Sequence, residues 1–348
     1  MRKFAISAGL ILLLFAALIR ARAQDAVTGE WRAEWRSDKK LVHLELHWGG
    51  WGRESNWGST ISPDQLTGLD TASFGKDAVV HFELRRDAGT VAFEGRFHDG
   101  RGSGDFRFTP NPEFIAGMRE LGYAGLSSEQ LLGMAILDIS RQFVRELADA
   151  GYKNLPVDDL FAARIHRVTP DFIRALRAEG LDRVSMDDLV AMRIHGVTPE
   201  LVHEMRGLGL NALSADNLVA MRIHRVTPEY VREMRSLGLT ALSCDDLVAM
   251  QIHQVTPDYA QQMRGLGVSD LSSDNLVAMR IHRVTPEFVR ELKDLGYEHL
   301  TSDQLVAMSI HRVDGAFIRD ARQRGYKNLS VDDLIDLRIH GFRSRPTV

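Results

Sequence analysis

Histidines that recur at one fixed interval are the residues whose type and spacing first suggest chemistry. They stand 29 residues apart, at His166, His195, His224, His253, His282, His311 and His340. Imidazole is a common metal ligand, so one hypothesis is an array of metal sites. Two histidines on one zinc ion must each place a nitrogen about 2.1 Å from it, whereas stacked helices lie about 8–10 Å apart. We therefore expect no metal, and instead expect each imidazole to bond free carbonyls at a helix C-terminus.

A basic column has the same period and suggests a charged binding surface. Its members are Arg177, Arg206, Arg235, Arg264, Lys293 and Arg322. Acidic residues precede them with the same period, at Asp171, Glu200, Glu229, Asp258 and Glu287. Two interpretations stay open: ion pairs within or between repeats, each of which contributes little, or a ridge that binds an acidic partner. The candidate binding residues of the two columns are Arg206, Arg235, Arg264, His195, His224, His253 and His282.

Motifs of catalysis are absent from the sequence. His203-Glu204 is followed by Met-Arg-Gly and so lacks the second histidine of a zinc protease. The sequence contains no G-x-S-x-G nucleophile turn, phosphate-binding loop or dinucleotide-binding fingerprint. Acidic pairs such as Asp245-Asp246 lack the glycine of a calcium loop and are better explained as helix caps. Cys244, the one cysteine, stands where other repeats carry alanine, serine or valine. We expect a protein that is not an enzyme and has no cofactor.

The elements that position these columns follow from the string Val-Thr-Pro, whose threonine recurs every 29 residues from Thr169 to Thr285. Degenerate copies extend this frame to eight units between Asn111 and Phe342, without an insertion or deletion. In the unit that begins at Thr227, the threonine suits an N-cap and Pro228 suits the first helical turn. A later glycine, Gly238 in this unit, occurs in all eight units and suits the helix C-terminus. A serine such as Ser243 is the N-cap of a second helix.

Each helix is about ten residues long, which is too short for stability in water without neighbours. The apolar face of the second helix is formed, in one unit, by Leu247, Val248, Met250 and Ile252. A methionine column at the Met250 position is expected in the core. Because single units cannot bury such faces, stacked neighbours must do so. The sequence predicts a mostly α protein, with an α-solenoid of eight 29-residue two-helix repeats over 111–342 and a tail at 343–348. A closed or globular helical array is the alternative.

Residues 24–110 have a different pattern, which predicts a small antiparallel β domain before the repeats. Apolar and polar residues alternate over 41–48, 79–84 and 91–97, as they do in half-buried strands. Asp87-Ala88-Gly89 predicts a hairpin turn, and the glycine-rich run 99–104 predicts a longer turn. Four or five strands are expected, in a small sheet or a partial barrel.

All five tryptophans lie in this β domain, at Trp31, Trp35, Trp48, Trp51 and Trp57. Aromatic faces can stack on sugars, so one interpretation is a carbohydrate or peptidoglycan site, and the other is that they fill the core of the sheet. Trp51 and Trp57 fall in a stretch rich in glycine and serine. We expect them to be the exposed pair and the candidate glycan-binding residues.

The N-terminus has the pattern of a secretory signal peptide. Basic residues at 2–3 precede an apolar stretch over 4–19, and an A-x-A cleavage signal ends at Ala23. We expect a signal peptide over 1–23, cleavage after Ala23, and a periplasmic or secreted protein without membrane attachment; an uncleaved anchor is the alternative. Cleavage removes four basic residues and moves the formal net charge from −4 to −8. Such an acidic protein is a poor candidate for binding nucleic acid.

Two segments resemble extracytoplasmic regions attached to bacterial membrane metallopeptidase sensors of the beta-lactam-sensor type. One contains Val-Ala-Phe-Glu-Gly-Arg-Phe at 91–97 and Gly-Ser-Gly-Asp-Phe at 102–106, and the other is the repeated Val-Thr-Pro-Glu-Phe/Tyr-Val-Arg-Glu-Met. The membrane helices and zinc motif of the peptidase are absent here, so no protease activity is implied. The resemblance implies a location in the cell envelope and a signalling context.

The organisation of the chain favours binding over catalysis, because stacked repeats build an extended surface for contacts. We expect an exported, non-enzymatic binding scaffold whose helical repeats contact a protein or peptide partner. The alternative is a carbohydrate- or peptidoglycan-binding module centred on the tryptophan-rich β domain.

Overall fold

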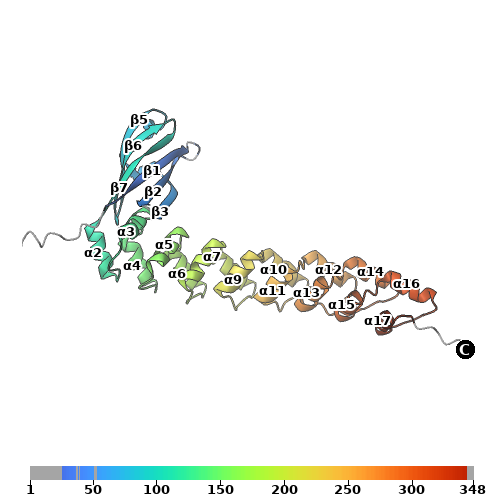
Figure 1. Cartoon of the computed structure of the whole chain (residues 1–348). Coiled ribbons are helices and arrows are strands. Elements are labelled where there is room, and N and C mark those ends of the chain that lie inside the picture. The colour runs from blue at the N-terminus through green and yellow to red at the C-terminus, as the bar shows by residue number, and fades with distance from the viewer. Residues whose placement is uncertain (1–25, 37, 39, 51–52, 343–348) are drawn as a thin grey trace, which may run out of the picture. The chain divides into compact units, whose positions relative to one another are not determined.

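The computed structural model describes residues 26–36, 38, 40–50 and 53–342 of the chain (Figure 1). The signal peptide predicted over 1–23, the tail predicted at 343–348 and the candidate residue Trp51 lie outside the described residues. Within them, no helix has the length and hydrophobicity needed to cross a membrane.

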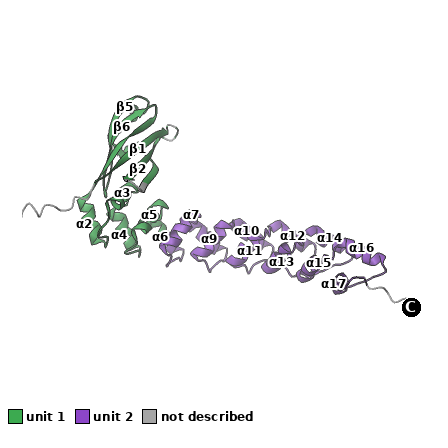
Figure 2. Ribbon diagram, viewed as in Figure 1, with its two compact units in different colours: residues 1–173 green, residues 174–348 purple. Residues whose placement is uncertain are grey.

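Contacts divide the chain into two compact units, residues 1–173 and 174–348 (Figure 2). Unit 1 contains the sheet and the first helices, and unit 2 contains the remaining helices. The border falls inside the helix Pro170–Ala178 (α6). The domain border expected after residue 110 stays a prediction.

Seven antiparallel strands form one sheet in the described part of unit 1, in the order β3-β2-β1-β7-β6-β5-β4. Their bounds are Val27–Arg36 (β1), Leu41–Gly50 (β2), Arg53–Ile61 (β3), Leu66–Thr67 (β4), Ala78–Arg86 (β5), Gly89–His98 (β6) and Arg101–Pro110 (β7). Short 3-10 turns lie at Pro63–Gln65 and Thr71–Ser73. The three strands predicted from alternation are confirmed in β2, β5 and β6, but the sheet has more strands than the four or five expected.

The alternating apolar side chains pack together as the core of unit 1. Trp31 is fully buried. Its ring meets Phe82 and Phe93 edge-on, with ring centroids 5.2 and 6.2 Å away. Helix α3 (Ser128–Ile136) packs against strands β1, β5, β6 and β7. The sheet therefore shares its core with one of the first helices of the array.

The glycine-rich run 99–104 is not the long turn that its composition predicts. Only Asp99 and Gly100 form the turn, and β7 begins at Arg101. A Cβ atom on Gly102 would lie 2.8 Å from the rings of Trp31 and Phe97. The glycine is therefore required by aromatic rings that pack on the strand, and this requirement comes from tertiary structure.

Sixteen helices follow the sheet in the described residues, each nine residues long except the last, which has ten. Those that begin in unit 1 are α2 (Pro112–Glu120), α3, α4 (Arg141–Asp149), α5 (Val157–Ile165) and α6. Those of unit 2 are α7 (Met186–Ile194), α8 (Pro199–Gly207), α9 (Ala215–Ile223), α10 (Pro228–Ser236), α11 (Cys244–Ile252), α12 (Pro257–Gly265), α13 (Ser273–Ile281), α14 (Pro286–Asp294), α15 (Ser302–Ile310), α16 (Gly315–Gln323) and α17 (Val331–His340).

The caps of these helices confirm the prediction from sequence. Thr227 Oγ1 accepts a hydrogen bond from the backbone N–H of Tyr230 at 3.2 Å. Ser243 Oγ accepts one from the N–H of Asp246 at 3.0 Å. Gly238 ends α10 with a positive φ of 85°, a conformation that glycine adopts without steric cost. Each cap satisfies backbone groups that a helix end otherwise leaves free.

The helices of unit 2 stack in two rows (Figure 1). We call α7, α9, α11, α13, α15 and α17 the odd row, and α8, α10, α12, α14 and α16 the even row. Side chains of the methionine column are at most 1% exposed, and its members are Met192, Met221, Met250, Met279 and Met308. The predicted core role of this column is confirmed.

Candidate functional site

Exposed isoleucines form a column along the odd row of unit 2. This isoleucine column consists of Ile194, Ile223, Ile252, Ile281, Ile310 and Ile339, which are between 51% and 56% exposed. The prediction that Ile252 belongs to the buried face of its helix is wrong. Ile252 stands two residues after the buried Met250, and two residues on a helix differ by about 200° in direction. A large exposed apolar patch is more informative than a buried one, because it has no role in the core.

Five of the six isoleucines, in α7 to α15 of the odd row, belong to a face with the same composition in each helix; in α17, Ile335 and Asp336 replace the valine and the alanine. In α11 this face carries Asp245, Val248, Ala249 and Ile252, at the spacing i, i+3, i+4 and i+7 of one helix side. The valine and alanine are half-buried, and the aspartate is exposed. The exposed aspartates form an acidic edge at the helix N-termini: Asp187, Asp216, Asp245, Asp274, Asp303 and Asp332. Exposed arginines just past the C-termini form a basic edge: Arg225, Arg283 and Arg312.

The isoleucine position is more constant than an exposed position in the middle of the even-row helices. On the even row, one exposed position carries His203, Arg232, Gln261 and Arg290 in successive helices. The exposed position of the odd row carries isoleucine in every helix from α7 to α17. Core packing does not require a half-exposed side chain to stay the same, so the constancy of this column points to a contact made outside the chain's own core.

Unit 1 contains one helix in which the equivalent face is covered. In α3 the positions equivalent to Val190 and Ile194 are Leu132 and Ile136, which are 0% and 7% exposed. Helix α3 is the helix that packs against the sheet. In α5 the next equivalent, Ile165, is again 57% exposed. The face is therefore compatible with full burial wherever a partner surface is present.

The candidate histidines lie beside the isoleucine column as the C-cap residues of the odd row. His340 Nδ1 lies 3.1 Å from Asp336 O, one turn earlier in the same helix, but its nearest partner is the Asp336 carboxylate, at 2.8 Å. His195, His224, His253 and His282 make no such bond, and their half-buried rings have no hydrogen-bond partner within the described residues.

Side chains of the following repeat explain why these imidazoles are not needed as caps. Arg222 Nε donates to His195 O at 3.1 Å, and Arg280 Nε donates to His253 O at 3.2 Å. Ser309 Oγ donates to His282 O at 2.6 Å. The carbonyls of His195, His253 and His282 are thus satisfied by a neighbouring helix. Within the described residues, no group of three or more potential ligands is arranged to hold a metal ion.

The candidate arginines Arg206, Arg235 and Arg264 lie on the even row, away from the C-caps that hold the histidines. Each guanidinium covers a glycine that ends a helix one repeat earlier. A Cβ on Gly180 would lie 3.1 Å from the nearest nitrogen of Arg206, and one on Gly238 would lie 2.9 Å from Arg264. This packing joins successive repeats, and Arg264 is also exposed; a binding role for the column stays a prediction.

The tryptophans of the sheet do not form an exposed aromatic platform in the described residues. Trp31 is buried, and Trp35 stacks on Phe74 with ring centroids 4.5 Å apart. Trp48 and Trp57 are half-buried. The prediction that Trp57 lies in a loop is wrong, because it belongs to the strand β3 and pairs with Leu46 of β2.

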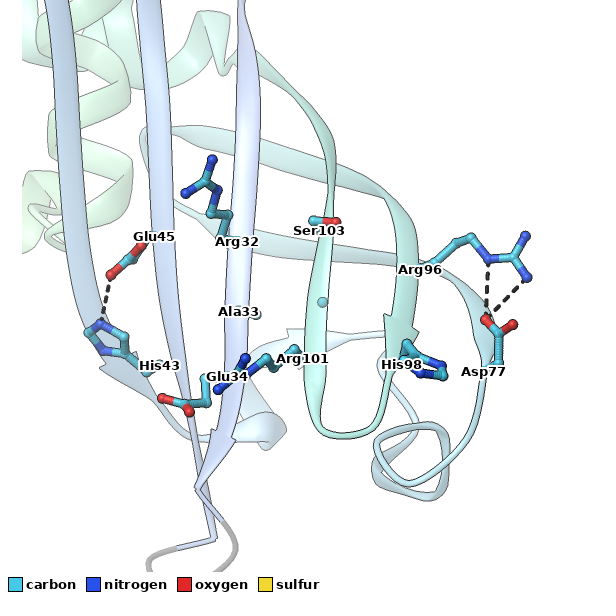
Figure 3. A pocket seen from close by; sticks show the side chains of 11 residues that line it. Arg32, Ala33, Glu34, His43, Glu45, Asp77, Arg96, His98, Arg101 and Ser103 are labelled. Carbon is cyan, nitrogen blue, oxygen red and sulfur yellow. Dashed lines mark hydrogen bonds and ion pairs between the residues drawn. The ribbon is translucent and has the colours of Figure 1, made fainter.

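A polar groove of about 680 Å³ lies on the sheet of unit 1 (Figure 3). Ser103 is paired with Arg32 of β1 and with Arg96 of β6. An ion pair and a hydrogen bond hold part of the lining: Arg96 Nη2 lies 3.2 Å from Asp77 Oδ1, and His43 Nε2 lies 3.3 Å from Glu45 Oε1. The other lining residues are Ala33, Glu34, His98, Arg101 and Gly102. Sequence reasoning missed this groove because its residues come from strands that only the sheet brings together.

Comparison with known protein families and with curated proteins returns no match for this chain.

Proposed function

We propose that this protein is a non-enzymatic binding scaffold that holds a protein or peptide partner along the isoleucine column. We further propose that its helices form an α-solenoid of eight 29-residue two-helix repeats, and that the protein works outside the cytoplasm, in the cell envelope. The observation that carries the proposal is the column itself, six isoleucines at one position of six successive helices, each about half exposed.

Two physical arguments support a protein or peptide as the ligand. The column extends over six helices, so its apolar surface is long and shallow, as at interfaces between proteins, whereas a small molecule prefers a concave pocket. Acidic and basic edges flank the apolar residues. Such a polar rim around an apolar centre is typical of surfaces that bind other proteins.

Photo-crosslinking at single positions tests this function. A photoreactive amino acid replaces Ile252 in one variant and Gln261, an exposed residue of the even row, in a matched control. We expect a crosslinked protein adduct from position 252 in cells that produce the protein, and none from position 261. Equal adducts from both positions, or no adduct from position 252, would overturn the proposal.

The polar groove supports a second candidate function, binding of a glycan that carries carboxylate groups. Arg32 and Arg101 line it, and guanidinium groups bind carboxylates in a bidentate manner. Titration calorimetry with acidic and neutral glycans of equal length tests this function. We expect the protein to bind the acidic glycan but not the neutral one, and we expect an Arg32→Ala/Arg101→Ala variant to lose this binding. If neither glycan produces heat of binding, the glycan-binding function is excluded.

A further inference from the structure

We propose that the partner on the isoleucine column is a second copy of this chain. Two helical arrays pair through their odd rows, with the facing helices antiparallel. The inference rests on the proposed function, because it takes the same surface and names what covers it.

Spacing favours this partner, since two copies of one array share the same distance between isoleucines. Neighbouring helices of a stack lie about 8–10 Å apart. Only a surface whose contact residues have the same spacing can contact every isoleucine of the column. In each helix from α7 to α15 of the odd row, isoleucine lies near the C-terminus, with valine and alanine one turn before it; α17 carries Ile335 and Asp336 at those two positions. When facing helices run antiparallel, Ile252 of one copy packs between the valine and alanine of the opposing helix.

The charged edges favour antiparallel over parallel facing helices in the dimer. Parallel helices would place the acidic edge of one copy against the acidic edge of the other, and like charges in contact are unfavourable. Antiparallel helices place the acidic edge opposite the basic edge. Asp274 at the start of α13 then faces Arg283, just past the end of α13, in the other copy.

The area of the face is sufficient for a stable dimer. Nine-residue helices are about 13 Å long, so six of them at 8–10 Å spacing cover roughly 700 Å² on each copy. Stable interfaces of standard size bury about 800 Å² on each partner. The burial of Leu132 and Ile136 in α3 shows, within this chain, that side chains at these positions pack well when a surface covers them.

Analytical ultracentrifugation of the intact protein tests the dimer. We expect a dimer that Ile252→Asp weakens by about 100-fold or more, as for a buried apolar anchor at the centre of an interface. Gln261→Asp on the even row adds the same charge and is expected to leave the dimer unchanged. Circular dichroism verifies that both variants keep their helices.

A charge exchange tests the antiparallel arrangement separately. Asp274→Arg and Arg283→Asp are each expected to weaken the dimer, and the double variant is expected to restore it, because the two positions face each other across the interface. A wild-type chain that is still monomeric at roughly 100 μM, well above the micromolar range for interfaces of this size, overturns the inference. So does a dimer that Ile252→Asp leaves intact. If the protein is a monomer but still forms adducts with other proteins from position 252, the proposed dimer is wrong and the proposed binding function is supported.

Discussion

Asp87, in the turn between β5 and β6, accepts hydrogen bonds from three nitrogens of Arg141, the first residue of helix α4. The carboxylate accepts the backbone N–H of Arg141 at 2.9 Å. It also accepts Nε at 3.0 Å and Nη2 at 2.7 Å from the same side chain. Bidentate pairs of this kind are stronger than neutral hydrogen bonds. This contact fastens the sheet of unit 1 to a helix that begins more than fifty residues later in the chain.

Replacing Asp87 is expected to destabilise unit 1. Asp87→Ala leaves the N-cap Ser140 in place but removes the acceptor of the Arg141 N–H and a charge-assisted pair, which corresponds to about 2 kcal/mol of unfolding free energy. Tryptophan fluorescence during urea unfolding is the suitable measurement, because all the tryptophans of the chain lie before residue 58. Asp77→Ala, at a side chain that is 58% exposed, is the control and should cost less than about 0.5 kcal/mol. Equal losses in both variants would contradict this role of Asp87.

The same contact predicts a dependence of stability on acid pH. The hydrogen bond from Arg141 holds the pKa of Asp87 below its usual value. Because the folded-state pKa is lower than the unfolded-state pKa, the pair stabilises the fold at neutral pH, and this contribution disappears as the pH falls through the folded-state pKa. Urea midpoints measured from neutral to strongly acidic pH should decline less in Asp87→Ala than in the wild type. Identical slopes in the two proteins would argue against this linkage.

Exposure predicts different effects for two apolar residues of α11. Met250→Ala leaves a cavity in the core and should cost about 2–5 kcal/mol. Ile252→Ser changes a side chain that is 51% exposed and should change stability by less than about 0.5 kcal/mol. The measurement is urea unfolding of dilute protein followed by circular dichroism. A large loss of stability from Ile252→Ser at low concentration would show that the isoleucine belongs to the core after all.

Two tyrosines join successive repeats through buried hydrogen bonds, and their removal should loosen unit 2. The hydroxyl of Tyr230 donates to Val255 O at 2.8 Å, and that of Tyr259 donates to Val284 O at 2.8 Å. Phenylalanine fills the same position at Phe288, so Tyr259→Phe removes the hydroxyl without crowding. We expect a loss of about 1 kcal/mol, since a buried carbonyl loses its donor.

Alkaline pH gives a second readout for these tyrosines. Burial raises the pKa of Tyr230 and of Tyr259. Because the folded-state pKa is raised, the stabilisation is complete below the unfolded-state pKa of about 10 and declines as the pH rises above it. A Tyr230→Phe/Tyr259→Phe variant should lose less stability than the wild type between neutral and alkaline pH in urea unfolding. An unchanged alkaline profile would contradict the burial of these hydroxyls.

Cys244 should react with thiol reagents only when α11 unfolds. The side chain is 6% exposed, and burial raises the pKa of its thiol, with a further contribution from Asp245. Both effects lower the fraction of reactive thiolate. Labelling in native buffer should therefore be far slower than in urea, whereas a Cys244→Ser/Ser236→Cys variant should label rapidly in both, because Ser236 is exposed. Rapid labelling of the native wild type would disprove the burial of this thiol.

Local interactions explain what the sequence could predict of the fold. A cap such as Thr227 depends on a backbone N–H only three residues away, so the residue types alone reveal it. The same holds for Gly238 at the end of α10 and for the alternation that marks β2, β5 and β6. The prediction failed at Gly102 because this glycine makes room for Trp31, and that ring lies on another strand.

The candidate site shows the same division between local and distant interactions. The histidine and arginine columns are visible in the sequence as a 29-residue period, but their roles depend on the next repeat. Arg222 and Arg280 take the carbonyls that the histidines were expected to bind, and Arg206 covers a glycine of the repeat before it. The period itself says nothing about such neighbours.

The sequence by itself determined the positions of the helices and their caps, because each is set by residues within one repeat. Only the tertiary structure decided that Met250 is buried while Ile252 is exposed. Both are apolar residues near the end of one short helix, and periodicity over nine residues leaves the width of the buried face open. Burial depends on which side of the helix its neighbours in the stack cover, and that is a property of the packed array.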